Sequence, residues 1–231
     1  MKYDLSRMEI LRNRLDLNME PTKPEGEQDA GVLILIHDDG TDFKVLLCVR
    51  SRQLRRHPGE VCFPGGMMDE LDGGNVRLTA IREAEEEVGI TNGDDYTILG
   101  NLPSFRARFG VLIHPTVALL RRPLRITMNI DEVESVFWIS LLRFLDDLHH
   151  TAIPINDVYF LHMFQFGDAP TTFGVTALMC IVVAIGVYQM TPQYDLLANL
   201  TRDDMEEGMS SLQIIQHIYK HAGMKFIKSK I

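Results

Sequence analysis

The stretch GGMMDELDGGNVRLTAIREAEEEVGI, from Gly65 to Ile90, decides the fold of this 231-residue chain. Its second half predicts a helix of about four turns, because Asn75 is a favourable N-cap residue and Gly89 a favourable stop. At about 100° per residue, one side of this helix is apolar and is expected to face the core. The apolar stripe consists of Leu78, Ile81, Ala84 and Val88.

Three glutamates share the opposite side of the predicted helix, within about 100° of one another. They are Glu83, Glu86 and Glu87. Like charges three or four residues apart destabilise an isolated helix by about a few tenths of a kcal/mol per pair, and a solvated acidic face is the commoner meaning of such a pattern. A divalent cation would reverse the repulsion, since hard ions such as Mg²⁺ prefer oxygen ligands.

The sequence around the glutamates resembles the signature of the Nudix hydrolases, G-x5-E-x7-R-E-U-x-E-E-x-G-U, in which U is aliphatic. The second half of the signature matches at Arg82, Glu83, Glu86, Glu87, Gly89 and Ile90. The first half departs from it, because the spacing from Gly66 to Arg82 is two residues longer and no glutamate occupies the early acidic position. The sequence leaves open whether Asp69, Glu70 or Asp72 takes that position.

A second motif precedes the first: LLCVRSRQLRRHPGEVCFPGG, from Leu46 to Gly66. It holds four arginines, Arg50, Arg52, Arg55 and Arg56. A basic run is usually a solvated loop, but beside a metal site arginine forks match phosphate oxygens. The stretch resembles the motif LLTxR(S/A)x3Rx3Gx3FPGG of the coenzyme A diphosphatase subgroup of Nudix enzymes. The matching positions are Leu46, Leu47, Arg50, Ser51, Arg55, Gly59, Phe63, Pro64, Gly65 and Gly66, and Cys48 replaces the threonine.

The resemblance implies an α/β fold with a mixed β-sheet sandwiched between α-helices. It implies that Glu83, Glu86 and Glu87 bind Mg²⁺ or Mn²⁺, and that Arg82 orients a neighbouring glutamate. It assigns substrate contacts to Arg50, Arg55, Gly65 and Gly66. Nudix enzymes often draw a further carboxylate from outside the signature, and Asp131, Glu132 and Glu134 are the candidates.

The implied activity is hydrolysis of the diphosphate of coenzyme A and acyl-coenzyme A to 3′,5′-ADP and 4′-phosphopantetheine or its acyl form. One alternative is a Nudix hydrolase of another nucleoside diphosphate derivative, such as ADP-ribose or a dinucleotide. Another is a nucleotide-binding module without turnover. A third, from a different class, is a membrane-anchored interaction protein built on the apolar run from Phe173 to Tyr188. That run is shorter than the ~20 residues that span a bilayer, so we expect a buried helix and no membrane.

Along the chain, the pattern predicts an N-terminal helix and linker (1–29), one Nudix domain (30–225) and a short tail (226–231). Apolar runs on both sides of Asp39-Gly40 predict a β-hairpin. Further strands are expected in Thr97–Gly100, Gly110–Leu120, Val133–Leu141 and Asp157–Phe166, with Pro115 at an edge or bulge. Helices are expected in residues 4–17 and 211–220.

Composition narrows the possible partners. A net charge of −9 argues against broad nucleic-acid binding, which requires a positive surface. The three cysteines, Cys48, Cys62 and Cys180, predict reduced thiols and no disulfide or zinc framework.

The final residues Ser229, Lys230 and Ile231 differ from the peroxisomal signal Ser-Lys-Leu by one aliphatic exchange. They predict a peroxisomal location and an import receptor as partner.

Overall fold

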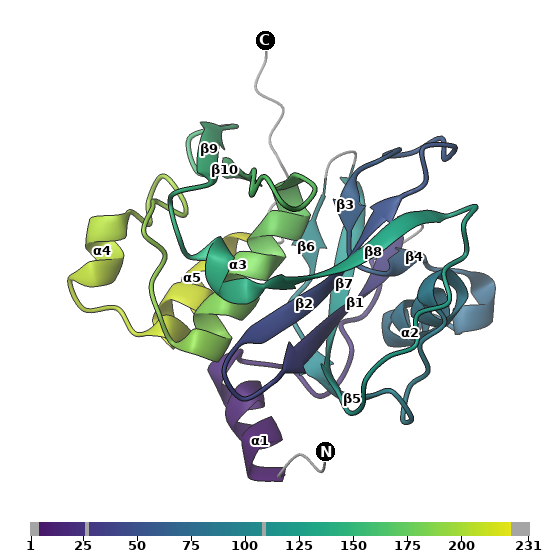
Figure 1. Ribbon diagram of the computed structural model, residues 1–231. Coiled ribbons are helices and arrows are strands. Elements are labelled where there is room, and N and C mark those ends of the chain that lie inside the picture. Colours follow the sequence, from purple (N-terminus) through teal and green to yellow (C-terminus); the bar gives the residue numbers. More distant parts are fainter. Residues whose placement is uncertain (1–4, 26–27, 108–109, 223–231) are drawn as a thin grey trace.

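The centre of the protein is a mixed β-sheet that lies between helices (Figure 1). The computed structural model describes residues 5–25, 28–107 and 110–222. In these residues the strand order β3-β2-β1-β7-β5 is extended by β4 on β1, β6 on β7 and β8 on β2. The strands are β1 (Asp29–Asp38), β2 (Phe43–Arg50), β3 (Val61–Cys62), β4 (Gly65–Met67), β5 (Tyr96–Asn101), β6 (Phe105–Arg106), β7 (Leu112–Leu120) and β8 (Val133–Ser140). β1 and β7 are parallel and the other pairs of this sheet are antiparallel.

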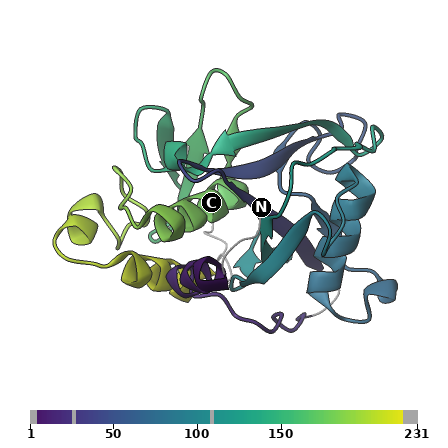
Figure 2. The ribbon, with the colours of Figure 1, turned by 60° about the horizontal axis from the view of Figure 1, so that its bottom comes forward.

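Helices cover both faces of this sheet, which confirms the predicted sandwich. α2 (Val76–Val88) lies on one side, and α3 (Gly174–Tyr188) lies on the other (Figure 1). α1 (Leu5–Arg14) and α5 (Ser211–Ala222) lie beside each other on the α3 side (Figure 2). Along β1, Leu33 and Leu35 belong to the core around α2, whereas Ile34 and Ile36 belong to the core around α3. This alternation follows from the two-residue period of a strand.

The predicted hairpin forms β1 and β2, with His37 opposite Lys44. Its turn is held by the Asp39 carboxylate, which accepts hydrogen bonds from the amides of Thr41 and Asp42. Gly40 has a φ of 91°, a conformation that favours glycine. A local turn signal was therefore enough to place two central strands.

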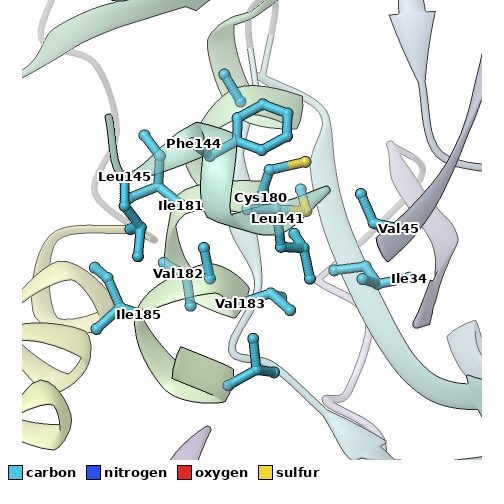
Figure 3. Packing of buried hydrophobic residues seen from close by; sticks show 14 of the residues in the cluster. Ile34, Val45, Leu141, Phe144, Leu145, Cys180, Ile181, Val182, Val183 and Ile185 are labelled. Carbon is cyan, nitrogen blue, oxygen red and sulfur yellow. The ribbon is translucent and has the colours of Figure 1, made fainter. Parts of the chain in front are cut away.

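The apolar run near residue 180 is the buried helix α3, as predicted. Its side chains meet those of β1, β2 and the 3-10 helix η3 (Leu141–Phe144) in the core shown in Figure 3. Cys180, Ile181 and Val183 have no exposed surface. Among the described residues, no helix is both long and apolar enough to cross a bilayer.

The predicted apolar stripe of α2 is wrong at two of its four positions. Leu78 is 48% exposed and Ile81 is half-buried, although Ala84 and Val88 are fully buried. α2 approaches β1 at Gly31, where an added Cβ would lie 2.3 Å from the carbonyl oxygen of Val76. This close approach brings a different side of α2 to the sheet. The buried residues of α2 are Val76, Thr79, Ala80, Ala84, Glu87 and Val88.

Other expectations on strands need correction. Pro115 lies in β7, which is flanked by β1 and β5 and is not an edge strand. The register shift of the β5–β7 pair lies between Ile98 and Gly100 of β5, opposite Val117 and Ala118 and not opposite Pro115. The expected strand in Asp157–Phe166 is β10 (Phe160–Phe164), which pairs with the unpredicted strands β9 (His150–Pro154) and β11 (Thr172–Phe173). A further short helix, α4 (Arg202–Glu206), precedes α5.

The two terminal helices complete the core on the α3 side. Leu11 of α1 is buried together with Leu15 just after it, and Ile214, Ile215 and Ile218 of α5 are buried as well. The three cysteines are free thiols, as predicted, and Cys48 lies opposite Cys62 in the β2–β3 pair. The predicted targeting residues Ser229, Lys230 and Ile231 lie outside the described residues.

Candidate metal and phosphate site

Three carboxylates meet where α2 passes the end of the sheet. One oxygen each from Glu83, Glu87 and Glu132 lies within 4.8 Å of the other two. Glu132 comes from the segment before β8, which is held against α2 because the amide of Asn129 donates to the carbonyl of Glu87 over 2.9 Å. The amide of Ser51 donates to the Glu132 carbonyl over 2.8 Å and fixes its other side. We call Glu83, Glu87 and Glu132 the carboxylate cluster.

Two consecutive glycines of β4 lie against the carboxylates of α2. The amide of Gly65 donates to Oε2 of Glu87 over 2.9 Å. A Cβ on Gly66 would lie 2.5 Å from the carboxyl carbon of Glu83. Both glycines were predicted to touch substrate. In this structure each touches a carboxylate of the cluster.

Arg82 connects the helix to the glycine-rich loop before it. Its Nε and Nη2 reach the two carboxylate oxygens of Asp72, each over 3.0 Å. Its Nη1 donates to Glu83 over 2.8 Å and to Glu86 over 2.9 Å. Of the three acidic residues that the sequence left open, Asp72 is therefore the one that pairs with Arg82. Asp69 instead caps the 3-10 helix η1 (Glu70–Asp72).

Burial sets the protonation of these groups. Burial, assisted by the charge of Glu83, raises the pKa of Glu87 to about 7, against the opposing hydrogen bond from Gly65. Burial also raises the pKa of Glu83, although Arg82 opposes this shift. Burial acts the same way on Asp72, but the hydrogen bonds from Arg82, Asp69 and Thr79 outweigh it and hold the pKa of Asp72 below its usual value.

The remaining predicted site residues, Glu86, Arg50 and Arg55, lie outside the carboxylate cluster. Glu86 is exposed and bonded to Arg82, and it lies outside the carboxylate cluster. Arg50 is half-buried at the end of β2, where its positive charge offsets part of the rise in the pKa of Glu87. Arg55 is exposed in the loop 51–60.

Among the candidates for an added carboxylate, Asp131 is exposed and Glu134 pairs with Arg52 over 3.2 Å. Only Glu132 joins the cluster. No local signal in the sequence distinguishes it from its neighbours, because its position depends on the path of the segment from β7 to β8.

Comparison with known proteins identifies the family of this chain. A model of the NUDIX domain matches residues 27–160. Peroxisomal coenzyme A diphosphatase ndx-8 from Caenorhabditis elegans is 63% identical over 234 residues, which cover 100% of both chains. Peroxisomal coenzyme A diphosphatase NUDT7 from Mus musculus is 30% identical over 173 residues, 71% of this chain and 72% of its own. Among solved structures, a MutT/nudix family protein from Enterococcus faecalis matches 83% of this chain and 73% of its own at 18% identity, with a TM-score of 0.45. The domain match and the full-length relative show that this chain belongs to the Nudix hydrolase family.

Proposed function

We propose that this protein hydrolyses the diphosphate bond of coenzyme A and acyl-coenzyme A. The products are 3′,5′-ADP and 4′-phosphopantetheine, or the acyl form of the latter. The observation that carries the reaction class is the convergence of Glu83, Glu87 and Glu132 within 4.8 Å. The substrate is supported by the motif in Leu46–Gly66 and by the relatives named as coenzyme A diphosphatases.

The carboxylate cluster has the chemistry that Mg²⁺ or Mn²⁺ requires. Hard divalent ions take oxygen ligands, and three crowded carboxylates are stabilised when a cation neutralises them. A bound cation would offset the charge of the diphosphate and lower the pKa of a bound water. We assign the metal to Glu83 and Glu87, with Glu132 added by the structure and Glu86 retained from the family resemblance.

The protein's own groups hold this site in shape. Asp72 fixes the guanidinium of Arg82, and Arg82 in turn fixes Glu83 and Glu86. The Gly65 amide orients Glu87. Each of these hydrogen bonds involves a charged group, so each is stronger than a neutral one and restricts the carboxylates to few orientations.

Arg50 and Arg55 are proposed to recognise phosphates of the substrate, including the 3′-phosphate that distinguishes coenzyme A from its dephospho form. The half-buried position of Arg50 beside Glu87 supports a contact close to the reacting diphosphate. The exposed position of Arg55 in the loop 51–60 supports a contact at the outer end of the substrate.

The decisive experiment measures turnover of free coenzyme A with Mg²⁺ or Mn²⁺ and identifies both products by mass spectrometry. The proposal requires 3′,5′-ADP and 4′-phosphopantetheine, and loss of turnover in EDTA. Faster turnover of ADP-ribose or a dinucleotide would overturn the substrate assignment. Absence of turnover on all three classes would instead indicate a binding module.

We further propose a peroxisomal location and an import receptor as partner. Both rest on the names of the two relatives and on Ser229-Lys230-Ile231. A fluorescent protein fused to the N-terminus should co-localise with a peroxisomal marker and become diffuse when Ser229–Ile231 is deleted. Diffuse fluorescence with the intact tripeptide would refute this assignment, and it would leave the chemistry untouched.

A further inference from the structure

A chain of three hydrogen-bonded side chains lies beside the candidate site and has no part in the proposed reaction. Oδ1 of Asp29 lies 2.6 Å from Nε2 of His114, and Nδ1 of His114 lies 2.9 Å from Oγ of Ser104. Asp29 begins β1, His114 belongs to β7, and Ser104 lies between β5 and β6. The side chains of Asp29 and His114 are only 1% and 3% exposed, whereas Ser104 is half-buried.

The carboxylate determines the tautomer of the histidine. Oδ1 of Asp29 also accepts the amide hydrogen of Glu25 over 3.1 Å, so this oxygen acts as an acceptor. Nε2 of His114 then carries the hydrogen, and in the neutral ring Nδ1 is the acceptor for the Ser104 hydroxyl. The serine is thus hydrogen-bonded to a base that a buried carboxylate orients. In the usual triad the carboxylate binds Nδ1 of the histidine and the nucleophile binds Nε2. Here the two nitrogens are exchanged, but one still binds the carboxylate and the other still binds the hydroxyl.

The position of the relay favours a role in chemistry. His114 is opposite Gly31 in the β1–β7 pair, and Gly31 is opposite Gly66, which touches Glu83. Residues in register point to the same face of a sheet, so the relay shares the face of the carboxylate cluster, about 10 Å of backbone away. Burying a carboxylate costs free energy that an apolar pair would not, so packing alone does not require this arrangement.

We propose that Ser104 is the nucleophile of a second, metal-independent hydrolytic centre that acts on carboxylic esters and thioesters, with His114 as base and Asp29 as the group that orients it. Ser104 Oγ bonds to the acyl carbon while its proton passes to Nδ1 of His114. The bond to the alcohol or thiol breaks, and the leaving group takes that proton. Water then adds to the acyl group on Ser104 and gives a proton to His114. The carboxylic acid departs as that proton returns to Oγ, so water is the only co-reactant.

The test uses the full chain in EDTA, where metal-dependent turnover is absent. The protein is incubated with a fluorophosphonate probe, and the labelled residue is identified by peptide mass spectrometry. Hydrolysis of p-nitrophenyl acetate is followed in parallel. We expect one adduct, on Ser104, no adduct there in Ser104→Ala, and labelling slowed by about 10² or more in His114→Gln.

Ser140→Ala is the matched control, because Ser140 donates to a carboxylate, Asp42, over 2.9 Å but has no histidine partner. This variant should be labelled on Ser104 at the wild-type rate. The proposal is overturned if Ser104 of the folded wild-type protein stays unlabelled, or if Ser104→Ala hydrolyses the ester as fast as the wild type. The labelled residue found in the wild-type protein and the result for Ser104→Ala decide the question even if His114→Gln does not fold. None of these readouts depends on diphosphate hydrolysis.

Discussion

At the scale of single residues, two glycines of β4 help to fix where the carboxylates lie. Gly66 leaves room for Glu83, and Gly65 offers Glu87 an amide. The sequence motif identified these glycines as substrate contacts, but it could not show that they contact the glutamates of the cluster. The helical period also predicted that Glu87 lies on the side of α2 away from the core, although Glu87 is only 3% exposed. A carboxylate with an amide partner can be buried, and residue type alone does not reveal that partner.

Gly66→Ala should reduce activity much more than stability. The new Cβ would meet the end of a flexible side chain, Glu83, which can move aside without disrupting the backbone. A displacement of about 1 Å in a catalytic group can lower the rate by about 10². We expect kcat to fall by about this factor while the Tm changes by a few degrees at most. Gly40→Ala is the control for kcat only. Its φ of 91° makes alanine strained and should lower the Tm, but its added Cβ meets no atom within 4 Å and it lies outside the carboxylate cluster. Equal kcat in the two variants would contradict the geometry.

Glu87→Gln should lower kcat and kcat/KM together, by about 10² or more, because it removes charge and keeps shape. In EDTA at pH 8 the same change should not lower the Tm. Burial raises the pKa of Glu87 to about 7, so the ionised form is disfavoured in the folded state, and a neutral amide relieves that cost. Glu85→Gln, on the exposed side of the same helix, should leave both readouts unchanged. Wild-type turnover in Glu87→Gln would remove this residue from the site.

At the scale of elements, sequence patterns predicted the features that depend on residues within a single helix, strand or turn. The Asp39-Gly40 turn, the Asn75 cap and the apolar run of α3 each lie within one element, and each was placed correctly. β3, β4, β6 and β11 have only two or three residues, and each exists because another strand of the folded protein pairs with it. β9 was missed for a different reason. Most of its residues are exposed, so it has no apolar alternation to detect.

The β9–β10 pair should make the stability of the protein depend on pH. His150 of β9 and His162 of β10 share a hydrogen bond of 2.8 Å, and Nε2 of His162 donates to the Leu196 carbonyl over 2.9 Å. Burial lowers the pKa of both to about 4. The unfolded chain takes up these protons near pH 6.5, whereas the folded protein does not. The contribution of these two neutral histidines to the free energy of unfolding is therefore fully present above pH 6.5 and is lost as the pH falls toward about 4.

Urea unfolding between pH 5 and pH 8 measures this contribution. Glu83 and Glu87 titrate in the opposite sense, because their raised pKa values lower the stability as the pH rises. All proteins in this test therefore carry Glu83→Gln and Glu87→Gln. In that background the free energy of unfolding should be flat above pH 6.5 and should fall below it, by up to about 1.4 kcal/mol per pH unit for each proton. His162→Gln should reduce the slope between pH 6.5 and pH 5 to about half, because the buried His150 remains, whereas His149→Gln, at an exposed position, should retain the full slope. A slope that is the same in all three proteins would show that other groups cause it.

At the scale of the whole molecule, segments far apart in sequence meet at one end of the sheet. β1 begins there and β2 ends there, and the segment before β8 returns to the same place with Glu132. The two motifs predicted the family and most of the cluster because they cover 45 consecutive residues, from Leu46 to Ile90. Glu132 and the Asp29–His114–Ser104 relay could not be predicted, because only the folded sheet brings their strands together.

The same convergence makes metal binding a property of the folded molecule. In the unfolded chain Glu132 is separated from Glu87 by 44 intervening residues, so the cluster exists only in the native state. A cation that binds only the native state stabilises it by about 2.7 kcal/mol at a concentration 100 times its Kd, which for a chain of this size raises the Tm by roughly 5–11 °C. Mg²⁺ or Mn²⁺ should therefore raise the Tm in a concentration-dependent way, and EDTA should reverse the rise. The double variant Glu83→Gln, Glu87→Gln should lose the rise, while Glu85→Gln should keep it. If the double variant gained as many degrees as the wild type, the cation would bind elsewhere and the carboxylate cluster would not be the metal site.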